Sequence, residues 1–306
     1  VRVWSQTHAG GLPSNQVLPT ASELKLSTYS LDSAVDFDRR YAAKSRLDVV
    51  GKTFARVAQE ILLKQERTSA SLLMTSLAGA TITTSPLASD VQVFKGAVAD
   101  AFLMDDVNNL FTLAKRINSS WIGGTPTERT KGITDLICSP EVVGSIRAMA
   151  YNPVNTRGGR GDAAAGDGST AFPLAATDEV RNDLYRNAGI SSFMGLNILE
   201  YNEMGEGQKF NTLFDTAAAA TAYTKWDGTD SGVFAATDEI VVGIDRTRDS
   251  LIRAVATDAE SGSEFTLLAD DQYSIRQNKI GYFGSVEEGR VILDNRVLCG
   301  VIVDRA

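Results

Sequence analysis

An uninterrupted helical pattern from about Asp38 to Leu77 is the feature that most constrains the fold of this chain. Its apolar residues are spaced by 4, 3 and 4 positions, which places them on one face of a helix. The central four are Val50, Phe54, Val57 and Ile61. A helix of about 40 residues spans about 60 Å, which exceeds the diameter of a compact globule of this size. We therefore predict one long helix that reaches across the molecule or beyond it.

The apolar stripe is wider toward its end and has a polar interruption. Ala58 and Leu62 widen it, and Leu72, Leu73 and Leu77 continue it. Residues 65–69 (Gln-Glu-Arg-Thr-Ser) are polar, which indicates a helix that passes over a surface or against a neighbour. A coiled coil is the alternative, but a sustained heptad with charged flanks is absent.

Residues 1 to about 36 precede this helix and are typical of an extended arm or loose hairpin. The segment contains Gly10, Gly11, Pro13 and Pro19 and has no helical period. Its apolar side chains are too few for a core, yet they are larger than a disordered tail carries. We therefore expect the arm to become ordered by docking on neighbouring subunits.

The remaining pattern predicts an α+β fold with helices early and a mainly antiparallel sheet late. Helices are expected near residues 105–114, from Ser139-Pro140-Glu141 onward, and over 177–189. In the second of these, serine can cap the helix and proline favours the first helical position. The predicted strands cover residues 133–138, 190–201, 239–244, 251–256 and 264–268. A tight hairpin at residues 294–296 is expected between strands 291–293 and 297–303.

Residue counts disfavour enzymatic chemistry. The single histidine, His8, lies in a glycine-rich terminal stretch, which is a poor platform for a triad base. No phosphate-binding loop motif occurs, and adjacent acids such as Asp105-Asp106, Asp270-Asp271 and Glu287-Glu288 come without a partner base or ligand pattern. We predict no catalytic, cofactor-binding or metal-ligating residues, no cofactor, and no enzyme.

The two cysteines and the net charge further limit the class of protein. Cys138 and Cys299 lie in apolar surroundings and are expected to be buried, reduced thiols. The formal net charge of −8 disfavours a protein whose main task is to bind nucleic-acid phosphates. No apolar run is long enough to span a bilayer, so we expect a soluble chain without membrane contact. The first residue, Val1, is not methionine, which indicates processing or trimming.

Four segments, in this order, resemble the major capsid proteins of tailed bacteriophages with the Hong Kong 97-type fold. Residues 61–67 resemble the family's spine helix, residues 136–143 its strand, Ser-Pro and helix in the axial (A) domain, and residues 193–200 the strand after the axial loops. Residues 282–303 resemble the closing strands of the peripheral (P) domain. One departure is that only about residues 15–36 are available for the family's extended E-loop, which would therefore be short.

This resemblance implies an α+β fold with four parts. Residues 1–36 would form the N-terminal arm and a short E-loop-like segment, and residues 37–130 the peripheral domain with its spine helix. Residues 131–235 would form the axial domain, with a mobile loop near 155–175, and residues 236–306 a β-rich segment that returns to the peripheral domain.

The resemblance also implies a structural protein that self-assembles, as hexamers and pentamers, into an icosahedral head shell around double-stranded DNA. Implied partners are portal, scaffold or decoration proteins and packaged DNA without sequence-specific contact. The implied location is the virion, after assembly in the host bacterial cytoplasm. The alternatives are an encapsulin-type nanocompartment shell, a hydrolase or transferase, and a non-shell α+β domain that adheres through Arg160-Gly161-Asp162.

The adhesive alternative gives the first testable prediction. Residues 158–168 contain five glycines, Gly158, Gly159, Gly161, Gly166 and Gly168, and a loop of this composition is costly to order. Replacement of Arg160-Gly161-Asp162 by Ala-Gly-Ala should therefore leave particle assembly unchanged in electron micrographs. Loss of particles would mean that the tripeptide makes an assembly contact.

Overall fold

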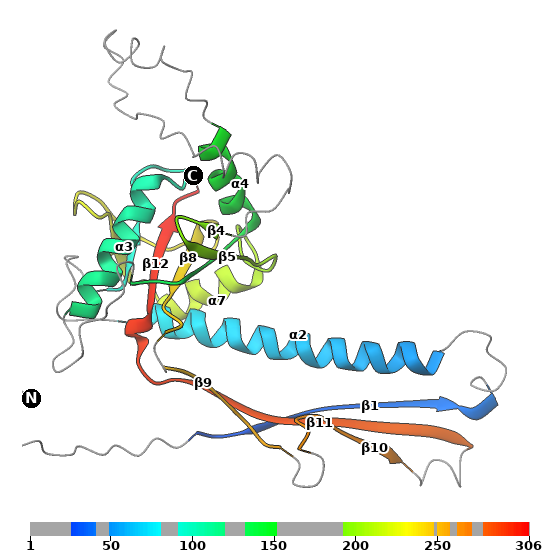
Figure 1. The fold of residues 1–306 in the computed structure, drawn as a ribbon. Coiled ribbons are helices and arrows are strands. Elements are labelled where there is room, and N and C mark those ends of the chain that lie inside the picture. Colours follow the sequence, from blue (N-terminus) through cyan, green and yellow to red (C-terminus); the bar gives the residue numbers. More distant parts are fainter. Residues whose placement is uncertain are drawn as a thin grey trace, which may run out of the picture.

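The computed structural model describes residues 26–40, 49–80, 91–119, 132–151, 192–247, 250–257, 262–270 and 278–305. It shows two β-sheets connected by one long helix, α2, which spans Val49–Ala78 (Figure 1). The expectations for His8, for most of the arm, for the Arg160-Gly161-Asp162 loop and for a helix over 177–189 lie outside the described residues.

The long helix is confirmed as α2, which begins at Val49, whereas the prediction began near Asp38. Arg39 and Arg40 are helical, and residues 41–48 lie outside the described residues. Residues Tyr29–Asp38 form strand β1, so Asp38 ends a strand. The reason is a period of two over this stretch, in which Leu31, Val35 and Phe37 alternate with more exposed residues. The 30 residues of α2 extend about 45 Å.

The buried stripe of α2 is narrower than the sequence indicates. Val57, Ile61 and Leu77 are buried as predicted, and Phe54 is half-buried. Leu62, which we expected to widen the stripe, is 59% exposed, because the sheet below covers only one side of this part of the helix.

A four-stranded antiparallel sheet lies against the first half of α2. Strand β11 (Lys279–Ile292) is central, and β1 pairs with it from Tyr29↔Glu288 to Asp38↔Lys279. On its other side β11 pairs with β9 (Leu251–Val255) and β10 (Thr266–Asp270). In Figure 1 this sheet runs beneath α2 and roughly parallel to it.

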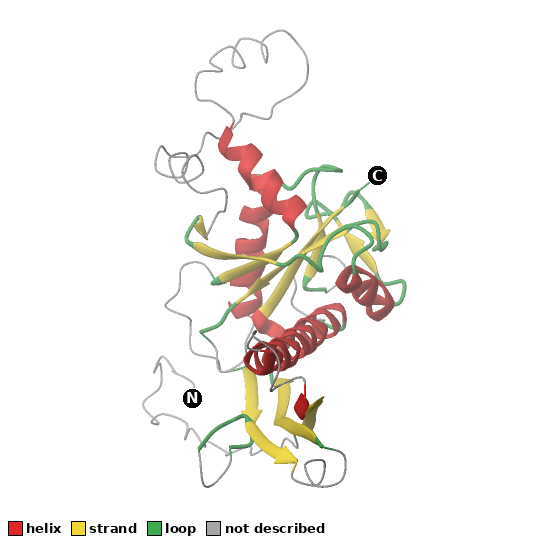
Figure 2. Ribbon diagram, turned by 90° about the vertical axis from the view of Figure 1, so that its right-hand side faces the viewer, coloured by secondary structure: helices red, strands yellow, loops and turns green. Residues whose placement is uncertain are grey.

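A six-stranded mixed sheet forms the second unit. Its strand order is β2-β12-β8-β3-β5-β4. The strands are β2 (Val93–Lys95), β3 (Asp135–Cys138), β4 (Ser192–Phe193), β5 (Leu196–Glu200), β8 (Glu239–Ile244) and β12 (Leu298–Val303). A small hairpin of β6 (Ala222–Thr224) and β7 (Ser231–Val233) accompanies it. Figure 2 shows this unit and the four-stranded sheet on opposite sides of α2.

Helices cover both faces of the six-stranded sheet. One face packs against α3 (Met104–Ser119) and α4 (Pro140–Tyr151), through residues such as Leu110 and Ile146. The other face packs against α7 (Lys209–Ala218) and the end of α2, through residues such as Phe214 and Leu77. Central strands buried on both faces need continuous apolar runs, as found in β8 and β12.

Local start signals in the sequence are confirmed here. The Ser139 hydroxyl accepts a hydrogen bond from the Val142 N–H at 3.2 Å, and Pro140 opens α4. The strand before it, β3, lies within the predicted range of 133–138. The predicted strands over 239–244 and 251–256 are present as β8 and β9, and that over 264–268 is present as β10, shifted by two residues.

The hairpin predicted at residues 294–296 is wrong. Strands β11 and β12 belong to different sheets and do not pair with each other. They are connected by a short 3-10 helix, η3 (Asn295–Val297), and the Asp294 carboxylate accepts a hydrogen bond from the Arg296 N–H. The chain forms a 3-10 turn where the sequence signals one, but long-range pairing decides the partner of each strand.

The two large sheets are built from segments that lie far apart in the chain. Residues 91–119 supply β2 and α3 to the six-stranded unit. Residues 236–306 supply β8 and β12 to this unit and β9, β10 and β11 to the other. The closing segment therefore crosses between the units, because β12 completes the core between β2 and β8.

Replacement of Phe54 tests the contact between α2 and the four-stranded sheet. The Phe54 ring meets the Tyr282 ring edge-on, with centroids 4.7 Å apart. Phe54→Asp should lower the free energy of unfolding by about 3 kcal/mol, because it places a charge in an apolar contact. Chemical denaturation measures this, with the exposed neighbour Ala55→Asp as the control. Equal stability of the two variants would contradict the contact.

Candidate assembly surfaces

Helix α2 contributes to two separate cores. Near its start, Val57 and Ile61 pack with Val286 of β11 and with Leu31 and Val35 of β1. Near its end, Met74 and Leu77 pack into the core of the six-stranded unit. One helix therefore holds two sheets that share no strand.

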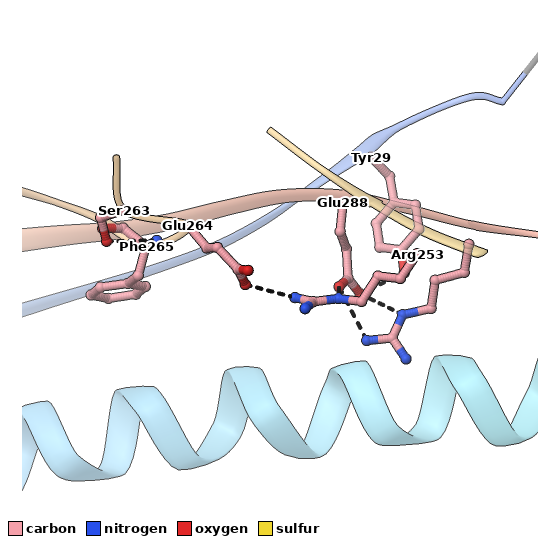
Figure 3. Close-up of polar contacts among 7 residues, drawn as sticks. Tyr29, Arg253, Ser263, Glu264, Phe265 and Glu288 are labelled. Atoms are coloured by element: carbon pink, nitrogen blue, oxygen red, sulfur yellow. Dashed lines mark hydrogen bonds and ion pairs between the residues drawn. The ribbon is translucent and has the colours of Figure 1, made fainter. Parts of the chain in front are cut away.

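A charged cluster lies between these two apolar contacts, on the sheet face toward α2 (Figure 3). The Glu288 carboxylate is fully buried and accepts a hydrogen bond from Arg253 Nε at 2.8 Å and from Tyr29 Oη at 2.9 Å. Arg290 donates to both carboxylate oxygens at 3.1 Å. Arg253 also pairs with Glu264 at 3.3 Å. One carboxylate thereby joins β1, β9 and β11.

Hydrogen bonding decides the protonation of this carboxylate. Burial on its own would raise the pKa of Glu288, but the hydrogen bonds from Arg290, Arg253 and Tyr29 outweigh it and hold the pKa below its ordinary value. Burial, together with the neighbouring carboxylate, raises the pKa of Tyr29. Glu288 is therefore ionised and Tyr29 neutral at pH 7, which is the state that the hydrogen bonds require.

The polar interval of α2 matches the prediction of a helix that passes over a surface. Gln65 is 8% exposed. Arg67 donates to both carboxylate oxygens of Glu203, at 2.9 and 3.1 Å from Nε, and so ties α2 to the segment between β5 and α7. Arg67 therefore has its ionic partner within the chain and connects the helix to the six-stranded unit.

A second polar cluster closes the six-stranded unit around Glu239. This residue is 1% exposed, accepts a hydrogen bond from Ser139 Oγ at 2.9 Å, and pairs with Arg305 at 3.0 Å. Burial raises the pKa of Glu239, against the opposing effect of these partners. Lys95 of β2 pairs with Asp304 at 2.7 Å. The last described residues are thereby tied to β2, β8 and the start of α4.

Two of the acidic pairs noted in the sequence contain a buried carboxylate with a structural role. The Asp106 carboxylate is fully buried and accepts hydrogen bonds from the N–H groups of Leu103 and Ala97, which hold the segment before α3. Within the pair at 287–288, Glu287 is exposed and Glu288 buried. Among the described residues, no cluster of three or more His, Cys, Asp or Glu side chains could hold a metal ion.

The cysteines are buried as predicted. Cys138 and Cys299 are free thiols in the core, and burial raises the pKa of each to about 12. They are therefore protonated and unreactive at neutral pH. Within the described part of the chain, no helix is long and apolar enough to cross a membrane.

The Glu288 cluster was missed at the sequence level, although a signal was present. In β11, every second residue from 286 to 292 lies on one face of the sheet. These residues are Val286, Glu288, Arg290 and Ile292, so two charged side chains share a face with two apolar ones. A charge on a buried face needs a partner. The partner residue Arg253 is 35 residues away in the chain, so no local pattern identifies it.

Comparisons with known proteins rest on the fold alone. No family model and no curated protein matches the sequence. The whole chain superposes on 81% of a capsid subunit of a native GTA particle, with a TM-score of 0.55 and 12% identity. The capsid structure of cyanophage P-SCSP1u matches 97% of this chain over 82% of its own, with a TM-score of 0.51 and 14% identity.

The fold is of the Hong Kong 97 type. The long helix α2 and the two large sheets that it connects make up this fold. An encapsulin complex from Synechococcus elongatus PCC 7942 also matches, at a TM-score of 0.47 and 10% identity.

Replacement of Glu288 tests the charged cluster, with the exposed neighbour Glu287→Gln as the matched control. Glu288→Gln leaves two arginines without a buried anion, and should lower the free energy of unfolding at pH 7 by about 2 to 3 kcal/mol. This is the low end for a broken buried pair, because Arg253 is 38% exposed. A loss no larger than that of Glu287→Gln would contradict the role of the cluster.

The same variant has a defined pH dependence. The folded-state pKa of Glu288 is lowered, so its contribution is complete above the ordinary glutamate pKa of about 4.5 and disappears as the pH falls through the folded value. The stability difference between the wild type and Glu288→Gln should therefore shrink below about pH 4.5 in denaturation curves. A constant difference down to pH 2 would contradict ionisation of Glu288.

Proposed function

We propose that this protein is a major capsid subunit that self-assembles, as hexamers and pentamers, into the closed head shell of a tailed phage around double-stranded DNA. The observation that carries the proposal is the match of the whole chain to capsid subunits, over about four fifths of their length.

The physical properties of the chain suit this role. A shell subunit needs a rigid connection between the units that contact different neighbours. Helix α2 supplies this connection, because it packs into the cores of both units and is flanked by the ion pairs of Glu288 and Arg67. A genome held by confinement needs no base-reading surface, so a net charge of −8 is compatible with it. The role is structural and requires no reactive site.

The arm is proposed to make contacts between subunits. Its apolar residues include Trp4, Val17, Leu18 and Leu24, which are too sparse for a core. Buried between copies, each contributes about 25 cal/mol per Å² at every repeated contact. Portal, scaffold or decoration proteins would be further partners, and the virion the final location after assembly in the bacterial cytoplasm.

Removal of the arm tests folding and assembly separately. Deletion of residues 1–25 keeps Leu26, which packs against Gly289 of β11. Far-UV circular dichroism and the thermal melting of the unassembled subunit should be nearly unchanged, while closed shells should disappear from electron micrographs. Unfolding of the truncated subunit would place the arm in the core, and normal shells would show that it is not needed for assembly.

The full-length protein provides the reference for this experiment. Closed shells that contain DNA in micrographs of producing cells support the proposal. Empty or protein-filled shells would favour a nanocompartment, and small uniform oligomers would contradict a shell protein of either kind.

A further inference from the structure

A row of exposed residues runs along the first half of α2, on the side away from the four-stranded sheet. It consists of Lys52, Ala55, Gln59, Leu62 and Glu66, and their spacings of 3, 4, 3 and 4 residues keep them on one face of the helix. All five side chains are exposed, and Leu62 is 59% exposed. In Figure 1 no described element lies over this side of the first half of α2.

The same side of α2 is packed further along the helix. Ala70, Leu73 and Leu77 continue the spacing of the row and pack in the core of the six-stranded unit. The four-stranded sheet is held by the other side of the first half, through Val57 and Ile61. A partner can therefore cover the row without disturbing either core of the subunit.

The two ends of the row carry opposite charges. Lys52 and Glu66 lie about 21 Å apart along the helix, so they do not pair with each other in one subunit. Neither forms an ion pair with another of the described residues. In an antiparallel pair of these helices, Lys52 of each copy meets Glu66 of the other, whereas a parallel pair places like charges together. The order of the charges therefore makes the row complementary to an antiparallel copy of itself.

The sizes of the side chains show the same complementarity. Ala55 and Leu62 lie at nearly equal distances on either side of Gln59. Antiparallel packing therefore places the small alanine of each copy against the leucine of the other, which lets the two helices approach closely. Gln59 then faces Gln59 of the second copy, and each amide has both a donor and an acceptor for the other.

We propose that the first half of α2 packs antiparallel on α2 of a second copy of this chain, about a two-fold axis near Gln59. The same row is buried on both copies, as in any contact across a two-fold axis. A contact along about four helical turns is smaller than the roughly 800 Å² per partner of a standard interface. It therefore acts as one of several contacts between neighbouring subunits, and the inference deepens and rests on the proposed function.

Cysteine crosslinking in the assembled full-length protein tests the axis. The two native cysteines, Cys138 and Cys299, are buried, so Gln59→Cys supplies the accessible thiol. A short bis-maleimide should convert most of this variant to covalent dimers on denaturing gels, with no larger species, because a two-fold axis brings position 59 of exactly two copies together. Lys64→Cys, which is exposed on another side of α2, is the matched control and should remain monomeric.

Exchange of the two charges tests the pairing. Lys52→Glu and Glu66→Lys each place like charges opposite one another twice at every contact, and each should lower the yield of closed particles at least about threefold. The double variant Lys52→Glu/Glu66→Lys restores the attraction between copies and should recover the wild-type yield. Because the two positions are about 21 Å apart in one subunit, this recovery requires two copies. Circular dichroism of the unassembled subunits should be unchanged in all three variants.

The outcomes separate the inference from the proposed function. Closed shells in which Gln59→Cys stays monomeric would overturn the inference and leave the proposed function standing. Single charge variants that assemble like the wild type, or a double variant that assembles no better than they do, would also overturn it. Absence of closed shells from the wild-type preparation counts against the function itself. The crosslink is then measured on the oligomer that forms, where dimers through position 59 support the helix contact and monomers overturn it.

Discussion

The burial of α2 against two different sheets is the constraint on which the rest of this structure depends. Neither sheet closes on itself, and each uses one part of the helix to cover an apolar face. A helix about 45 Å long is stable only if most of its length is packed. The distance between the two apolar contacts along α2 therefore sets the distance between the two units. The polar residues of α2 between these contacts need hydrogen-bond or ionic partners within the chain.

Electrostatic pairing fills that interval. Glu288 joins β1, β9 and β11 through side-chain hydrogen bonds, and Arg67 links the helix to Glu203 in the other unit. A buried ion pair adds little net stability compared with apolar packing, but its loss is costly because one charge is left without a partner. Such pairs favour one arrangement of strands and helix over others, which matters in a subunit that has to meet its neighbours in a repeated geometry.

Patterns with short range in the sequence were predicted well, and long-range pairing was not. The cap at Ser139 and the stripe at Val57 and Ile61 depend on neighbours within one helical turn or so, and both are present. The signal at Asp294 correctly indicates a turn, yet β11 and β12 enter different sheets, since the partners of each strand come from distant parts of the chain. The pairing of Arg253 with Glu288 could not be predicted from the sequence for the same reason.

Strand β1 presents different residues to the core and to the exposed face of its sheet. In β1, one face supplies Leu31 and Val35 to the core, and the other presents Ala34 beside Asp32 and Asp36. A period of two lets a single strand serve the interior and an outward surface at once. Substitutions on the first face should therefore lower the stability of the subunit, whereas those on the second, exposed face should affect it much less.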